Sequence, residues 1–127
     1  MKKGKRYIIF FIIGGVGYAL IELLWRGRTH WSMMLAGGIC FVLFALITRW
    51  MKGLPLLAKA VTAATAVTLV ELVFGIIFNI VLGLGVWDYS NVPFNFLGQI
   101  CLLFSVLWGF LALIFLPIAE MIDKRIT

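Results

Sequence analysis

The chain has 127 residues, of which 64% are hydrophobic and 13% charged, and its mean hydropathy is +1.13. A water-soluble domain of this length needs more polar surface, so the composition excludes a soluble protein and indicates an integral membrane protein. The formal net charge of +6 is explained by membrane topology and contact with anionic lipid. The expected partner is therefore the lipid bilayer, and no nucleic-acid partner is predicted.

Four apolar segments determine the predicted architecture. Runs of about 17 to 25 apolar residues can cross roughly 30 Å of hydrocarbon as α-helices. The predicted spans are residues 7–25, 33–48, 60–84 and 97–119. The segments between them are too short to form a soluble domain. We therefore predict a single all-α transmembrane domain in which four helices form two hairpins.

The basic residues are distributed unevenly between the two sides that these spans define. Cytoplasmic segments next to spans carry an excess of Lys and Arg. One side holds Lys2, Lys3, Lys5, Arg6, Arg49, Lys52, Lys59, Lys124 and Arg125, and the other holds Arg26 and Arg28. We therefore predict a multi-pass protein of the cell membrane, either a bacterial inner membrane or a plasma membrane, with both termini in the cytoplasm.

Glu22 lies near the outer end of the first predicted span. An ionisable group in hydrocarbon costs several kcal/mol unless it is paired, protonated or surrounded by water, so Glu22 is a candidate site residue. Arg26 follows it by four residues, which is the favourable helical spacing for an ion pair. Two interpretations stay open: Glu22 contributes to a ligand pathway, or Arg26 neutralises it and the pair fixes helix packing.

Glu71 lies in the middle of an uncharged run, residues 60–86. No basic residue lies within a helical turn of it, so its carboxyl group must find a partner on another segment or stay protonated. Arg28 and His30 of the first outer loop are the candidate partners or gate residues. We predict that Glu71 binds a cation or a proton inside the bundle.

Two amides extend this polar interior. Asn79 lies about two helical turns after Glu71 and near the same face, with the small Gly75 midway between them. Gln99 in the last predicted span could line the same interior from the opposite side. We predict that these side chains, with Glu22, line an ion pathway. An interhelical hydrogen-bond seam is the alternative.

The second outer loop, residues 85–95, combines turn-forming residues with aromatic ones. Asp88 either caps the turn by accepting backbone hydrogen bonds or pairs with Arg28 and locks the two outer loops together. The aromatic residues that map to the outer interface are Trp25, Trp31, Trp87 and Tyr89. The aromatic belt of a membrane protein explains them, and a cage for a quaternary ammonium ligand is the alternative.

Short internal similarities suggest a duplication. Residues 37–40 resemble residues 98–101, and residues 20–23 resemble residues 69–72, in the same order along the chain. The halves would then be two hairpins of the same topology, related by a pseudo-two-fold axis along the membrane normal. In that arrangement Glu22 and Glu71 converge on one central site.

Several residues together resemble a known family. The resemblance rests on Glu22, Trp25-Arg26-Gly27, Glu71, Trp87-Asp88-Tyr89-Ser90, Asn95, Gly98, Ile100 and Trp108. It is to the small multispan membrane proteins described as "putative ABC-transporter type IV", the CmpB-like permeases, which include the animal transmembrane protein 229 group. The first outer loop lacks the Gly-Pro-rich stretch of many members. The resemblance implies transport, and because the chain contains no Walker A sequence, any ATP hydrolysis is expected from another polypeptide.

Three functions stay open. The first is a small transporter or channel whose interior acids bind a cation or a proton. The second is a non-catalytic membrane subunit that docks onto a partner such as a transporter complex. The third is a membrane-embedded enzyme acting on lipid, for which no catalytic motif is present; neither a cofactor nor a metal is expected. Because four helices enclose little volume, we expect a homo-oligomer or a further membrane subunit.

Overall fold

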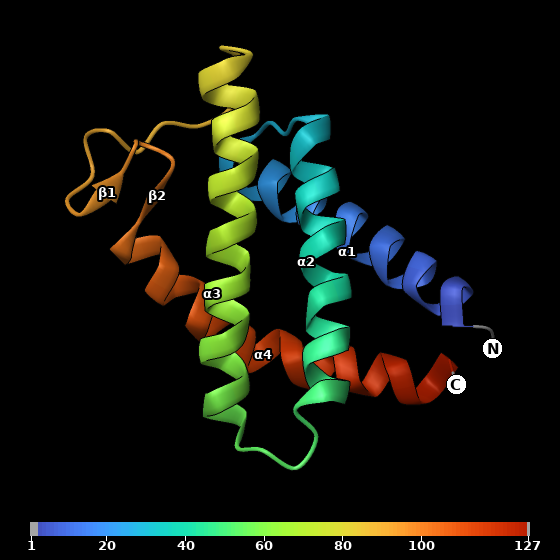
Figure 1. The fold of residues 1–127 in the computed structure, drawn as a ribbon. Helices are drawn as coiled ribbons and strands as arrows, with labels where there is room; N and C mark the ends of the chain where they lie inside the picture. Colours follow the sequence, from blue (N-terminus) through green and yellow to red (C-terminus); the bar gives the residue numbers. More distant parts are fainter. Residues whose placement is uncertain (1–2, 127) are drawn as a thin grey trace.

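The computed structural model describes residues 3–126, which form four long helices (Figure 1). In chain order these are α1 (Lys3–Arg26), α2 (Trp31–Trp50), α3 (Leu56–Phe74) with its π-helical continuation η1 (Gly75–Val81), and α4 (Leu102–Ile126). An antiparallel hairpin of β1 (Asn95–Phe96) and β2 (Ile100–Cys101) precedes α4. Each long helix in this range is apolar enough to cross a membrane, which confirms the predicted all-α membrane protein with four spans.

The helices differ from the predicted spans at their ends. Hydropathy marks only the part of a helix that lies in hydrocarbon, whereas backbone hydrogen bonding continues through interfacial residues such as Lys124 and Arg125 in the last turn of α4. The same helix begins at Leu102 rather than at residue 97, because Gly98, with φ of +71°, belongs to the turn of the β hairpin. Lys2, one of the basic residues that predict the orientation, lies outside the described residues.

Glycines allow α1 and α2 to pack closely. A Cβ atom added at Gly14 would lie 2.4 Å from the Cβ atom of Phe41, and one added at Gly37 would lie 2.6 Å from the Cβ atom of Tyr18. Side-chain carbons cannot approach one another so closely, so the two backbones meet only because these positions lack side chains. The contact holds Tyr18 against α2.

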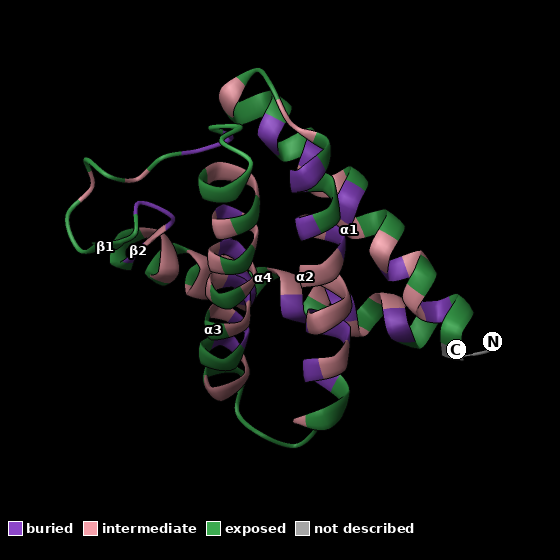
Figure 2. Ribbon diagram, turned by 45° about the horizontal axis from the view of Figure 1, so that its top comes forward, coloured by how far each residue is buried: buried purple, intermediate pink, exposed green. Residues whose placement is uncertain are grey.

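The core lies where α2, α3 and α4 meet, and it also holds the fully buried Phe10 of α1. In Figure 1, α2 stands beside α3 and α4 crosses behind both. Small residues allow this crossing, since Ala63 of α3 and Ala112 of α4 belong to the same buried cluster as Phe44 and Leu116. Figure 2 shows exposed stretches along the outward faces of the helices. These faces carry large apolar side chains, as surfaces that contact lipid do.

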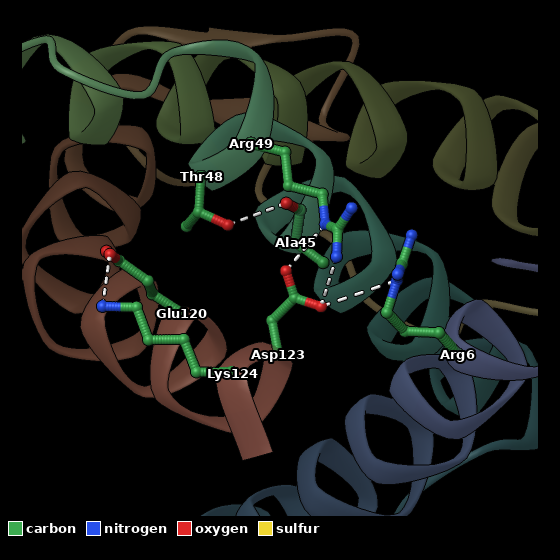
Figure 3. Close-up of polar contacts among 7 residues, drawn as sticks. All are labelled: Arg6, Ala45, Thr48, Arg49, Glu120, Asp123 and Lys124. Carbon is green, nitrogen blue, oxygen red and sulfur yellow. Dashed lines mark hydrogen bonds and ion pairs between the residues drawn. The ribbon is translucent and has the colours of Figure 1, made fainter. Parts of the chain in front are cut away.

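An ion-pair cluster joins three helices at the end of the bundle that holds both termini. The guanidinium group of Arg49 in α2 donates to both carboxylate oxygens of Asp123 in α4, at 2.7 and 3.0 Å (Figure 3). Arg6 of α1 lies 3.5 Å from the same carboxylate, and both Arg6 and Asp123 are buried. One acid thus connects α1, α2 and α4. It also explains why the two ends of the chain lie near each other (Figure 1).

The segments that suggest a duplication adopt different structures. Residues 37–40 lie in the middle of α2, whereas residues 98–101 span the turn and second strand of the β hairpin. Residues 20–23 and 69–72 are both helical. Only one of the two matching pairs of segments therefore has the same secondary structure in both members. The duplication stays a prediction.

Candidate functional site

A cavity of about 240 Å³ lies between the four helices and the outer segment, residues 82–94, which joins η1 to the β hairpin. Every helix contributes to its wall, including Tyr18 of α1, Cys40 of α2, Glu71 of α3 and Trp108 of α4, and Trp87 lines it from the outer segment. The lining is otherwise almost wholly apolar. A mainly apolar cavity with a few polar groups is the usual form of a small-molecule site.

Glu71 is the one acidic residue among those that line this cavity. It follows Ala60, Ala63 and Val67 on the buried face of α3, so helical periodicity turns its carboxyl group inward, and only 9% of the residue is exposed. Its Oε2 atom accepts a hydrogen bond of 3.0 Å from the hydroxyl group of Tyr89. Its Oε1 atom is buried and has no hydrogen-bond partner in the described part of the chain.

The partner of Glu71 differs from the predicted ones. Tyr89 supplies the contact, whereas His30 caps the start of α2 and Arg28 is exposed in the first outer loop. The Nδ1 atom of His30 lies 2.7 Å from the Ser32 hydroxyl group and accepts a hydrogen bond from the Ser32 amide. The expectation that Arg28 or His30 pairs with Glu71 is therefore corrected: the observed partner is the phenol of Tyr89.

Tyr89 is held in place as a donor. Its ring stacks on Phe104 with 5.0 Å between ring centroids, and its amide donates to the Gly98 carbonyl at 2.7 Å. Burial, and next the negative charge of Glu71, raise the pKa of Tyr89 above its ordinary value. The phenol is therefore protonated at neutral pH, which is the form that donates to Glu71.

Trp108 places an indole N–H beside the Glu71 carboxyl group at the cavity. The indole Nε1 atom is buried and has no hydrogen-bond partner among residues 3–126. The Trp108 and Tyr18 rings lie together on the cavity wall, with 6.3 Å between their centroids. The cavity therefore combines the Glu71 carboxyl group, the neighbouring indole N–H of Trp108 and aromatic faces.

Asn79 and Gln99, which are expected from the sequence to line one interior, contact each other away from the cavity wall. The Asn79 amide donates to Gln99 Oε1 at 2.8 Å, and Asn79 Oδ1 accepts from the Val86 amide at 2.6 Å. The Gln99 carbonyl accepts from the Trp87 indole at 2.9 Å. Neither amide is among the residues that line the cavity. Gln99 lies in the turn of the β hairpin rather than in α4, so these bonds join η1 to the hairpin and the loop before it. They form a hydrogen-bond seam at the outer end of α3 and η1 instead of a pathway lining.

Gly75 makes this seam possible at the junction of α3 and η1. A Cβ atom added to Gly75 would lie 2.6 Å from Gln99 Oε1 and 2.8 Å from Gln99 Cβ. The missing side chain therefore leaves the space that the Gln99 side chain occupies. The π-helical turn begins at the same residue, and such turns are frequent at functional sites.

Glu22 forms an ion pair near the outer end of α1. Its Oε2 atom lies 3.1 Å from Arg26 Nε, and the residue is 5% exposed. The Arg26 guanidinium group also contacts the Val86 carbonyl at 3.4 and 3.5 Å. Within the described chain Glu22 is not part of the cavity wall, and its pair with Arg26 ties α1 to the outer segment.

Asp88 caps the outer loop. Its Oδ1 atom accepts a hydrogen bond of 2.9 Å from the Ser90 amide, and this bond lowers the pKa of the exposed carboxyl group. No ion pair joins Asp88 to Arg28 among the residues that the structure describes. The capping interpretation therefore agrees with the observed geometry.

The aromatic residues of the outer interface divide into two groups. Trp25 and Trp31 are exposed and suit an aromatic belt, whereas Trp87 is buried and Tyr89 is half-buried against Glu71. Sequence reasoning missed Tyr18 and Trp108 as cavity residues. Their positions in the sequence could have indicated this role. Trp and Tyr are enriched at membrane interfaces, whereas these two lie inside apolar runs, away from the predicted ends of the spans.

Comparisons with known proteins give the family. No curated protein and no solved structure matches the chain. A family model described as "Putative ABC-transporter type IV" matches residues 8–127, which include most of α1, the other long helices, the outer segment and the cavity. The chain therefore belongs to the family of multi-pass membrane proteins that carries this ABC-transporter description.

Proposed function

We propose that this protein is a small transporter-like or channel-like membrane protein in which Glu71 binds a cation or a proton inside the central cavity. The observation that carries the proposal is the unusual position of this acid. The chain has five acidic residues, and Glu22, Glu120 and Asp123 each contact a basic side chain. Glu71 has no such contact in the described chain, and Asp88 is an exposed turn residue.

The energetics of burial support this role. A carboxylate in an apolar interior without a counter-charge is costly, so the group must hold a proton or a cation there. Tyr89 supplies one hydrogen bond and Oε1 stays open toward a ligand. Glu71 therefore has the properties of a group that exchanges its partner during transport.

The outer segment closes the cavity on the side away from the termini. Trp87 lines the cavity and Tyr89 contacts Glu71. The segment is held by hydrogen bonds of the Val86 backbone to Arg26 and Asn79, and of the Trp87 indole to the Gln99 carbonyl. In the proposed mechanism a proton or cation that binds Glu71 competes with the Tyr89 hydrogen bond and loosens this closure. The excess of basic residues near the termini supports a cytoplasmic location for the termini and for the Arg6–Asp123–Arg49 cluster.

The test is proton or cation flux into liposomes that contain the purified protein alone. We expect flux above that of empty liposomes, and we expect Glu71→Gln to abolish it while the protein still elutes as a folded species. Glu120→Gln is the matched control, because Glu120 is a more exposed acid paired with Lys124. Wild-type flux equal to that of empty liposomes, or equal flux in both variants, would contradict the proposal.

A second function is favoured by the family description. A chain of an ABC-transporter family without a Walker A sequence suits a membrane subunit that depends on another polypeptide for ATP hydrolysis. In that case the protein alone gives no flux, and affinity purification from its native membrane yields a stoichiometric partner. Glu71→Gln then lowers the yield of the complex rather than a flux.

A further inference from the structure

We propose that the cavity binds a lipophilic organic cation, an ammonium compound with an apolar body and about ten heavy atoms in all. This inference rests on the proposed function, because it names the class of cation that Glu71 takes. Three properties of the cavity lead to it: its single charged group, its aromatic wall and its volume.

The charge and the polar atoms of the cavity suit an ammonium group better than a bare metal ion. Hard cations such as Ca²⁺ take about six to eight oxygen ligands. The cavity wall offers side-chain oxygens only from Glu71 and Tyr18 among the residues that line it. The single carboxyl group of Glu71, with the Trp108 indole beside it, is sufficient to balance the charge of an ammonium ion.

The aromatic wall stabilises a positive charge that has lost its hydration. Tyr18, Trp87 and Trp108 all line the cavity, and the Tyr18 and Trp108 rings are 6.3 Å apart between centroids. Faces of Trp and Tyr attract cations within about 6 Å, and quaternary ammonium ligands are the usual beneficiaries. The sequence suggests an aromatic cage at the outer interface as an alternative. The aromatic side chains that line the cavity instead lie deeper, around Glu71.

The volume and the position of the cavity set the size and the route of the ligand. An apolar cavity of about 150 Å³ holds benzene, so about 240 Å³ holds about ten heavy atoms on the same scale. Ile13 and Ile21 line the cavity and are also 40% and 48% exposed on the outer face of α1. The cavity therefore reaches the lipid-facing surface, and an apolar cation dissolved in the bilayer can enter from the side.

The test compares two probes of equal shape and heavy-atom number, the cation benzyltrimethylammonium and the neutral hydrocarbon neopentylbenzene. Binding to protein in lipid nanodiscs is followed by quenching of tryptophan fluorescence, with empty nanodiscs as the partition control. We expect the cation to bind more tightly than the hydrocarbon by about tenfold or more. In Glu71→Gln this preference should disappear, and in Glu120→Gln it should be unchanged.

A second variant protects the test against misfolding of Glu71→Gln. Trp108→Leu removes an aromatic face but no charge, so it should weaken the cation several-fold and leave the hydrocarbon unaffected, whereas Trp108→Phe should retain most of the preference. Equal affinity for both probes, or cation binding that survives Glu71→Gln, would overturn the inference. If proton flux depends on Glu71 but the protein does not prefer the cation over the hydrocarbon, this inference is wrong and the proposed function is retained. Absence of both contradicts both.

Discussion

At the scale of single residues, the same type of side chain has different roles because its neighbours differ. Glu22 and Asp123 are buried beside arginines, whereas Glu71 is buried beside a phenol and an indole. A paired acid contributes to packing, but an unpaired one has to hold a proton or a ligand. The environment of Glu71, rather than its presence in a span, makes it the centre of the candidate site.

Replacement of Tyr89 tests the contact that holds Glu71. Tyr89→Phe keeps the ring stacked on Phe104 but leaves Glu71 Oε2 without its donor. We expect the free energy of unfolding in detergent to fall by about 1–3 kcal/mol, the usual effect of an unsatisfied buried acceptor. Tyr7 of α1 is half-buried, and Tyr7→Phe is the control, which should change the free energy of unfolding less.

The pH dependence of that effect follows from the pKa of Tyr89. Because burial and the charge of Glu71 raise this pKa above the unfolded value of about 10, the contribution of the phenol is fully present below that value. It is lost only as the pH rises through the folded pKa. The phenol of Tyr89 should therefore stay protonated at neutral pH, and a tyrosinate absorbance that appears there in wild type but not in Tyr89→Phe would contradict the assigned contact.

At the scale of elements, glycine positions decide which helices approach and which side chains reach the site. Gly14 and Gly37 bring α1 against α2, and Gly75 makes room for Gln99 beside η1. The sequence predicts four spans because hydropathy is local, but it does not show which glycines lie at a helix contact. The hairpin before α4 escaped prediction because Phe96, Leu97, Ile100 and Cys101 continue the apolar run of the helix that follows.

Two glycine substitutions should have opposite effects on stability. Gly37→Ala places a methyl group against Tyr18 and should destabilise the protein by about 1–3 kcal/mol through overpacking. Gly17→Ala has no atom within 4 Å of the added carbon and should stabilise α1 by up to about 1 kcal/mol through helix propensity. Thermal unfolding in detergent measures both. A loss of stability in Gly17→Ala equal to that in Gly37→Ala would show that the α1–α2 contact is not the cause.

At the scale of the whole molecule, one polar cluster lies at each end of the bundle and the cavity lies between them. Arg6, Arg49 and Asp123 join three helices near the termini, and Glu22 with Arg26 anchors the outer segment at the other end. These clusters fix the ends of helices whose outward faces are apolar. The central cavity can then change its occupant without loss of the overall arrangement.

Removal of the charge of Asp123 tests the cluster near the termini. Asp123→Asn leaves the buried Arg6 without its counter-charge, and we expect a loss of about 2–4 kcal/mol. This is less than for a fully buried pair, because the Arg49 side chain is 37% exposed and partly screened. Glu120→Gln, at an exposed pair, should change stability by about 0.5 kcal/mol or less. Equal unfolding of the two variants in a detergent titration would contradict the cluster's role.

The sequence by itself determined the membrane class, the number of spans and the candidate acids, because hydropathy and charge are properties of contiguous residues. Only the tertiary structure decided that Glu22 contacts Arg26 away from the cavity wall, that Asn79 and Gln99 satisfy each other, and that Tyr89 folds inward onto Glu71. These contacts depend on which helices become neighbours and how closely they pack. Burial and pairing, which turn an acid into a structural or a functional group, are set by residues distant in the chain.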